Sequence, residues 1–213
     1  MSLRKIIEGF SKELEETVKT LEDAISISRK VITLSKQAVM AIHRDRIDEA
    51  KNKLEEAANM LKQVETILSP HPDLDINILK IAYQEYAEAK ILINVIETEL
   101  FPGSAELNVP TIPYLLGLAD SIGEFRRRAL EFLRKGKLTK AERCFQVMDN
   151  IYSELVVLEN AYSLAPELRH KCDTARHLLE ITLGDIATET SRSALEKAIK
   201  QLDHRITSVK GEP

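Results

Sequence analysis

Two pairs of acidic residues stand in stretches of the sequence that are otherwise apolar. Glu85 and Glu88 are three residues apart, and Asp120 and Glu124 are four residues apart. At these spacings in an α-helix, both members of a pair lie on one face, with Cβ atoms about 5–6 Å apart. Two like charges in a half-buried place repel, so each pair requires a compensating cation or a raised carboxyl pKa. If the two stretches form an antiparallel hairpin, the four carboxylates converge.

Four carboxylates in one place form an all-oxygen site, which suits a hard divalent cation such as Mg²⁺, or Mn²⁺ as the second candidate. Such an ion activates water and neutralises the charge that develops when a phosphodiester is hydrolysed. The acids therefore predict a metal-dependent phosphodiesterase. The spacing alone leaves the alternative open that all four are surface residues with salt-bridge partners.

Two glycines accompany the second acidic pair. Gly117 and Gly123 stand inside a predicted helix, where each costs roughly 0.5–1 kcal/mol relative to alanine. A glycine at such a position favours the close approach of another backbone or of a ligand.

A basic stretch follows directly. Residues 126–143 contain eight Lys and Arg residues but only two Glu residues. Arg127 comes three residues after Glu124 and shares its face, and Arg134 continues that face. Arginine binds phosphate through paired hydrogen bonds, so this combination suits cleavage of RNA or DNA. Arg126 and Arg128 lie 100° to either side of Arg127, which favours structural or subunit contacts for one or both.

A second basic group stands near the end of the first predicted helix. The candidates for phosphate contacts in the two groups are Arg127, Arg128, Arg134, Lys30, Lys36 and Arg44. For the second group the alternative is an ordinary solvated surface, the usual environment of Lys and Arg.

The composition predicts an all-α scaffold. Only 7 Gly and 7 Pro occur in 213 residues, about half the usual share of turn-forming residues. Apolar positions recur every three or four residues, which is typical of amphipathic helices. They predict seven helices, at about 3–41, 47–68, 76–99, 111–134, 138–163, 166–183 and 188–209. Because no linker or fixed repeat divides the chain, we expect a single bundle over residues 1–213.

The sequence does not have the features of a membrane-spanning or a secreted protein. No apolar run approaches the roughly 18 residues of a membrane span, and the charged N-terminus is unlike a signal peptide. Cys144 and Cys172 show no metal-binding spacing, so we expect buried thiols in a reduced, cytoplasmic protein. The first forty residues carry more apolar positions than a short neighbouring helix covers, which predicts contact with another subunit.

Net charge does not argue against a nucleic-acid partner. The chain has 30 Lys and Arg against 34 Asp and Glu, a balance of −4. Without the four proposed metal ligands, the remaining acids and bases are equal in number.

Two other groups of acids and histidines contain the residue types of a metal site. A di-iron four-helix protein requires two Glu-x-x-His motifs and two further Glu, whereas only Glu167 and His170 show this spacing, which excludes the class. Asp173, His177 and Glu180 share one helix face, and either a metal site or a structural role fits them.

Two acidic motifs are specific enough to suggest a family. They read QEYAEA at 84–89 and YLLGLADSIGE at 114–124. They resemble the translin family, and most closely its translin-associated factor X branch with the short archaeal members. The resemblance covers most of the chain, from about residue 28 to residue 184.

This resemblance implies a translin-like helical fold and a divalent-metal-dependent ribonuclease. In the factor X branch the acids of both motifs form the catalytic site, and Glu85, Glu88, Asp120 and Glu124 match them position by position. It also implies a closed, hollow octamer with the acidic sites inside. The implied ligand is single-stranded or small structured RNA, with single-stranded DNA as a second candidate. The loop at 101–110 is short where the eukaryotic branch of the family has a much longer insertion, which argues against the eukaryotic substrates and partners. A homo-oligomer is then the simpler expectation.

Two other functions remain open at this point. Translin itself lacks the full acidic set and mainly binds single-stranded nucleic acid, so the alternative is a non-catalytic scaffold with structural acids. A helical protein–protein module is the third possibility, and it predicts no salt-dependent RNA binding.

Overall fold

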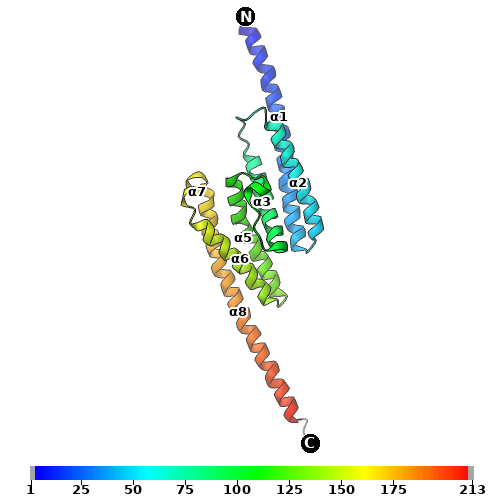
Figure 1. Ribbon diagram of the computed structural model, residues 1–213, viewed down its shortest axis with the longest axis vertical. Coiled ribbons are helices and arrows are strands. Elements are labelled where there is room, and N and C mark those ends of the chain that lie inside the picture. The colour runs from blue at the N-terminus through cyan, green and yellow to red at the C-terminus, as the bar shows by residue number, and fades with distance from the viewer. Residues whose placement is uncertain (1–2, 211–213) are drawn as a thin grey trace. The chain divides into compact units, whose positions relative to one another are not determined.

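The computed structural model describes residues 3–210, which form eight helices and no strand (Figure 1). The helices are α1 (Leu3–His43), α2 (Ile47–Leu68), α3 (Asn77–Thr98), α4 (Ser104–Leu107), α5 (Thr111–Arg134), α6 (Leu138–Val156), α7 (Glu159–Leu164) and α8 (Pro166–Lys210). The prediction of an all-α fold is confirmed.

Three details of the predicted helices were wrong. The short helix α4 lies in the segment expected to be a loop, and the helix expected at 138–163 is divided at residues 157–158 into α6 and α7. Gly184 was expected to end a helix but lies inside α8.

The backbone conformations of Gly136 and Gly184 explain why the helix end predicted at Gly184 was wrong. Gly136 ends α5 because it adopts a left-handed φ of +66°, and the N–H of Lys137 donates to the carbonyl of Phe132 at 2.8 Å. Gly184 keeps the helical conformation, in which a glycine lowers helix stability by about 1 kcal/mol without ending the helix.

The chain divides into two compact units, and the boundary falls inside α5. The first unit extends to Ser121 and contains α1 to α4 with the first half of α5. Within it α1 packs along both α2 and α3, as the blue, cyan and green helices of Figure 1 show. Its core is made of small and aliphatic side chains, among them Val31, Ile42, Leu54, Leu61, Ile91 and Leu92.

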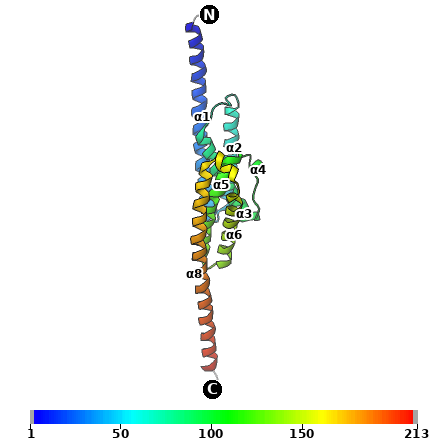
Figure 2. The same ribbon diagram turned by 90° about the vertical axis from the view of Figure 1, so that its left-hand side faces the viewer.

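The second unit begins at Ile122 and contains the rest of α5 with α6, α7 and α8. Here α8 packs on α6 and α7, with a buried row along α8 that includes Leu168, Cys172, Ala175 and Leu179. Figure 2 shows α8 as one continuous helix. No helix within residues 3–210 is long and apolar enough to cross a membrane.

Candidate functional site

Helices α3 and α5 touch backbone to backbone at Gly117. A Cβ atom at this position would lie 2.5 Å from the carbonyl oxygen of Gln84 and 3.0 Å from the amide nitrogen of Glu88. A contact of 2.5 Å is shorter than a Cβ atom tolerates, so only glycine allows the two helices to come this close. The predicted close approach is confirmed at Gly117. At Gly123 an added Cβ would meet nothing within 4 Å in the chain.

This contact places three of the predicted acids in the same part of the first unit. Glu85 and Glu88 lie on α3, and Asp120 lies one turn beyond Gly117 on α5. All three are half-buried. Their positions therefore follow directly from the glycine that lets α3 and α5 meet.

The carboxylate of Glu85 has a cation beside it. Nζ of Lys36, on α1, lies 3.2 Å from Oε1 of Glu85, and the Glu85 side chain is only 20% exposed. The lysine side chain is 62% exposed, so it reaches the site from the solvent side. The compensating charge expected for the first acidic pair thus comes from a third helix.

The carboxylate of Asp120 accepts a hydrogen bond across the two helices. Nε2 of Gln84 donates to Oδ2 of Asp120 at 2.6 Å. No role for Gln84 was predicted from the sequence, although this residue stands at the start of the first acidic motif. The side chain of the residue before Glu85 therefore fixes the orientation of the second motif.

Glu124 lies one turn beyond Asp120 on α5 and belongs to the second unit. Its Oε2 is 3.7 Å from Nη1 of Arg127, whose side chain is 60% exposed. Arg127 thus stands beside an acid of the second motif with most of its side chain open to solvent.

The acids do not form a metal cage in this arrangement. Within residues 3–210 no three His, Cys, Asp or Glu side chains are grouped closely enough to hold a metal ion. This holds for the four acids of the two motifs and also for Asp173, His177 and Glu180, which are exposed on α8. The alternative metal site on α8 therefore has no support from the structure.

The other candidate arginines make contacts with neighbouring side chains. Arg134 forms a two-point pair with Glu131, at 3.0 Å and 2.7 Å, which lowers the pKa of Glu131 to about 2 with the help of Lys135. Arg128 lies over the ring of Phe132, 5.1 Å from its centroid, an example of a cation–π contact.

Arg126 has the structural role that its position on α5 favours. Its side chain is 17% exposed, and its Nη2 lies 3.6 Å from Asp185 of α8. The expectation of a structural contact for one of the two arginines beside Arg127 is confirmed at Arg126.

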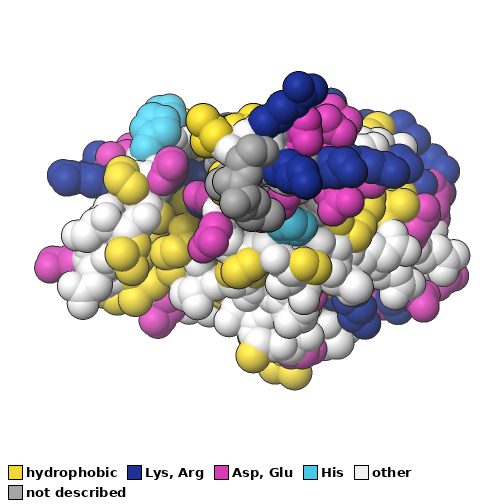
Figure 3. All heavy atoms as spheres, turned by 90° about the horizontal axis from the view of Figure 1, so that it is seen from above, with side chains coloured by type: hydrophobic (Ala, Val, Ile, Leu, Met, Phe, Trp, Pro, Cys, Tyr) yellow, Lys and Arg dark blue, Asp and Glu magenta, His cyan; other side chains and the backbone are white. Residues whose placement is uncertain are grey.

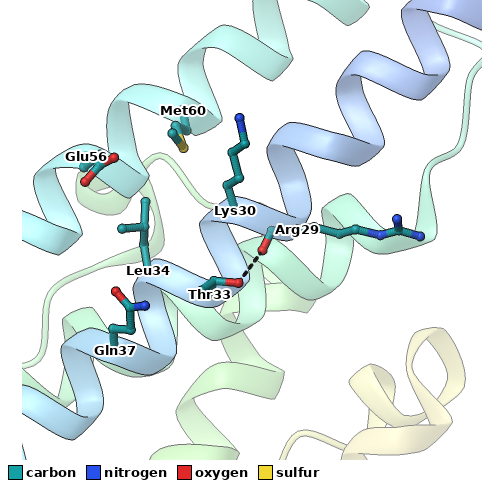
Figure 4. A pocket seen from close by; sticks show the side chains of 7 residues that line it. All are labelled: Arg29, Lys30, Thr33, Leu34, Gln37, Glu56 and Met60. Atoms are coloured by element: carbon teal, nitrogen blue, oxygen red, sulfur yellow. Dashed lines mark hydrogen bonds between the residues drawn. The ribbon is translucent and has the colours of Figure 1, made fainter.

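Two further candidates lie on α1 and beyond it. Lys30 lines a cavity of about 300 Å³ whose other lining residues are Arg29, Thr33, Leu34, Gln37, Glu56 and Met60. In Figure 4 the side chains of Arg29 and Lys30 point in different directions, Lys30 toward Met60 of α2. Arg44 follows the end of α1 and is exposed. On the face in Figure 3, Lys and Arg side chains lie next to Asp and Glu side chains.

Tyr83 connects the α3 motif to α2. Its hydroxyl donates to Oε1 of Glu65 at 2.6 Å, and Asn108 donates to the same carboxylate at 3.1 Å. Burial and the adjacent carboxylate raise the pKa of Tyr83 above its ordinary value, so the hydroxyl keeps its proton and remains a donor. This bond helps to fix α3 one turn before Glu88.

Comparison with known proteins gives the family. The model of the Translin family matches residues 12–180. The chain belongs to the translin family. The match includes both acidic motifs and extends from α1 through the first third of α8, so the translin domain contains parts of both compact units.

Solved structures agree with this family. The structure of AfC3PO with duplex RNA has a TM-score of 0.79 at 30% sequence identity, over 87% of this chain and 97% of that chain. A crystal structure of AfC3PO gives 0.81 at 30% identity, over 87% and 97% of the two chains. Apo-NeC3PO gives 0.78 at 25% identity, over 86% and 96%. The translin-like helical fold is thereby confirmed.

A curated relative is also similar. An uncharacterised protein of Methanocaldococcus jannaschii is 36% identical over 120 residues, or 56% of this translin-family chain. The aligned part spans about half of that relative, 54% of its length.

Proposed function

We propose that this translin-family chain binds RNA and cleaves it at the acidic residues of α3 and α5. The observation that carries the proposal is the backbone contact at Gly117, because it packs the helix that carries Glu85 and Glu88 against the helix that carries Asp120, and Lys36 lies beside Glu85. RNA binding is further supported by the fold shared with AfC3PO, whose structure with duplex RNA is similar over nearly its whole length.

Mg²⁺ is the proposed cofactor, with Mn²⁺ as a substitute. Glu85, Glu88, Asp120 and Glu124 would hold it, because carboxylate oxygens on neighbouring turns are the ligands that these hard cations prefer. The ion supplies an activated water and positive charge for phosphodiester hydrolysis. The chain's residues fit the ion in donor type, but Asp120 now faces Gln84 and Glu85 faces Lys36. Metal binding therefore competes with those two contacts.

Lys36 and Arg127 are the strongest candidates for holding the phosphates of the RNA. Each pairs with an acid of the site, and the two side chains are 62% and 60% exposed. When their acids turn to a metal ion, both cations become able to bind phosphate oxygens. Arg128, Arg134, Lys30 and Arg44 are proposed as outer contacts to the strand, where they contribute charge without touching the reacting group.

The proposed ligand is single-stranded RNA, with single-stranded DNA as a second ligand, and the proposed assembly is a closed homo-octamer in the cytoplasm. A homo-octamer is the simplest such assembly, because it closes without a second kind of chain. Because the proposed contacts are mainly to phosphates and do not depend on base sequence, the affinity for RNA should fall steeply as the salt concentration rises.

A non-catalytic RNA-binding scaffold is the second candidate. It is favoured by one observation, that Glu85, Asp120 and Glu124 each have a protein partner: Lys36, Gln84 and Arg127, respectively. In that case the acids hold α1, α3 and α5 together and no metal is needed.

One experiment separates the two. Labelled single-stranded RNA, duplex RNA and single-stranded DNA are incubated with the protein in Mg²⁺ or in EDTA, at low and high salt. If the chain is a nuclease, we expect salt-sensitive binding in both buffers and RNA cleavage only in Mg²⁺. Binding without cleavage would establish the scaffold, and cleavage that persists in EDTA would exclude the metal.

A further inference from the structure

The turn between α5 and α6 is rich in positive charge. α5 ends at Arg134 and α6 begins at Leu138, and residues 132–141 contain four Lys or Arg and no Asp or Glu. The turn is well defined, because Gly136 has a left-handed φ of +66° and the N–H of Lys137 donates to the carbonyl of Phe132 at 2.8 Å. The charges therefore stand on a fixed frame of two helices within the second unit.

Two cations from different helices share one aromatic ring. Cζ of Arg128, on α5, lies 5.1 Å from the centroid of the Phe132 ring, and Nζ of Lys140, on α6, lies 5.7 Å from it. Both distances are within the roughly 6 Å over which such a ring attracts a cation. The two charged groups are therefore no further apart than the sum of these distances. Phe132 is itself held in place, because it packs against the buried cluster that joins α5 to α6.

The lysines around the start of α6 have no carboxylate partner in the described part of the chain. The nearby acid Glu131 is engaged by Arg134 and Lys135. Lys137 and Lys140 are exposed, and among the described residues neither forms an ion pair. Cations that are held close together repel each other, and an anion placed beside them removes that repulsion. The arrangement therefore favours an anionic partner from outside the chain.

We propose that Arg128, Lys137 and Lys140, named the hairpin patch below, bind phosphates of the RNA strand. This inference rests on the RNA binding proposed above and does not depend on cleavage. The ring of Phe132 holds Arg128 and Lys140 in place before the strand arrives, so less side-chain freedom is lost on binding. Because phosphates carry no sequence information, the hairpin patch adds affinity without a base preference. Lys137 and Lys140 were not among the candidates from the sequence, since only the structure shows that Lys140 and Arg128 share a ring.

The salt dependence of RNA binding tests this proposal. Labelled single-stranded RNA is titrated in EDTA, so that neither metal nor cleavage enters, over about 50 to 200 mM salt. For single strands, the slope of log K against log salt is about −0.7 for each phosphate that the protein neutralises. The variant Arg128→Met/Lys137→Met/Lys140→Met should therefore make the slope less steep by about 2 and weaken binding about tenfold or more at the lowest salt.

A matched triple variant controls for the loss of charge. Lys62→Met/Lys197→Met/Lys200→Met removes three exposed lysines from α2 and α8, outside the hairpin patch. This variant should leave the slope and the affinity close to those of the native chain.

Phe132→Leu tests the role of the ring without changing the charge. The leucine keeps an apolar side chain against the cluster between α5 and α6. RNA binding should weaken about fivefold or more, because Arg128 and Lys140 are no longer held and must be ordered by the strand.

Four results would overturn the proposal. An unchanged slope in the hairpin-patch variant, with RNA bound by the native chain, would mean that the patch contacts no phosphate while RNA binding itself stands. Equal losses in the two triple variants would mean that only net charge matters. Native affinity in Phe132→Leu would mean that the ring does not prepare the cations. Absence of RNA binding by the native chain would overturn the proposed RNA binding as well.

Discussion

The side-chain amide of Gln84 donates a 2.6 Å hydrogen bond to the carboxylate of Asp120. The bond crosses from α3 to α5 one turn beyond the place where the backbones touch at Gly117. It joins the two acidic motifs, so the position of each acid depends on the packing of both helices. The chemistry proposed for the site therefore depends on a close helix–helix contact that can be altered without removing an acid.

Gly117→Ala should destabilise the protein by about 1–3 kcal/mol, the usual cost of inserting a methyl group into a filled space. The new Cβ would lie 2.5 Å from the backbone oxygen of Gln84, which cannot move like a side chain. Gly123→Ala is the matched control, because its Cβ meets nothing, and it should stabilise the helix by roughly 0.5–1 kcal/mol. Urea unfolding at a fixed protein concentration measures both, and equal effects would contradict the account.

Lys36→Met should have opposite effects on metal and on RNA. It removes a cation 3.2 Å from Glu85, so Mn²⁺ should bind roughly tenfold more tightly, as expected when a competing charge is lost. RNA binding should weaken, because a phosphate contact is lost. Calorimetric titration with Mn²⁺ and filter binding with RNA give the two readouts. Lys62→Met, an exposed lysine of α2, should change neither.

Tyr83→Phe should lower the free energy of unfolding by about 1–2 kcal/mol, because Glu65 loses a part-buried hydrogen bond. Since Asn108 still donates to Glu65, the loss should be partial. Adding Asn108→Ala should then cost more than the sum of the single effects, because the double variant leaves Glu65 without either donor. Urea unfolding of the two single variants and the double variant tests this coupling.

The pair of Glu131 and Arg134 should stabilise the protein only above acidic pH. The pKa of Glu131 is about 2 in the folded chain against an ordinary value of 4.5, because Arg134 and Lys135 bind its charged form. Its contribution is therefore fully present above about pH 4.5 and is lost as the pH falls toward 2. In Glu131→Gln this part of the pH dependence of unfolding should disappear. High salt should reduce it in the native chain, because the pair is exposed.

Cys144 should resist alkylation in the folded protein. Burial raises the pKa of its thiol to about 11, so the reactive thiolate is scarce at pH 8. Mass spectrometry after treatment with iodoacetamide should find Cys144 unmodified in native protein and modified in urea. Rapid native labelling would contradict its burial.

Much of this structure could be predicted because apolar periodicity and the missing side chain of glycine act locally on helix formation and on helix packing. The helices at 47–68 and 111–134 were predicted with their observed bounds, and Gly117 correctly indicated a close approach. The break at residues 157–158 and the continuity through Gly184 were missed, because tertiary packing decides whether a weak helix position ends a helix.

The partners of the acids could not be predicted, since they come from other elements. Nothing near Glu85 in the sequence indicates that Lys36 reaches it from α1. Gln84 is adjacent to Glu85, but its bond to Asp120 depends on the crossing of α3 and α5. Arg128 and Arg134 resembled phosphate ligands in sequence, and only the structure places Phe132 and Glu131 beside them.

The proposed activity requires half-buried carboxylates of α3 and α5 to cleave RNA with a bound metal ion. The most direct measurement is the single-turnover cleavage rate of labelled single-stranded RNA in Mg²⁺ for Glu88→Gln, beside Glu55→Gln, which changes an exposed acid of α2. We expect a rate lowered by about 100-fold or more for Glu88→Gln with RNA binding retained, because a metal ligand is lost, and an unchanged rate for Glu55→Gln. Equal rates for Glu88→Gln and the native chain would contradict metal-dependent cleavage at these carboxylates.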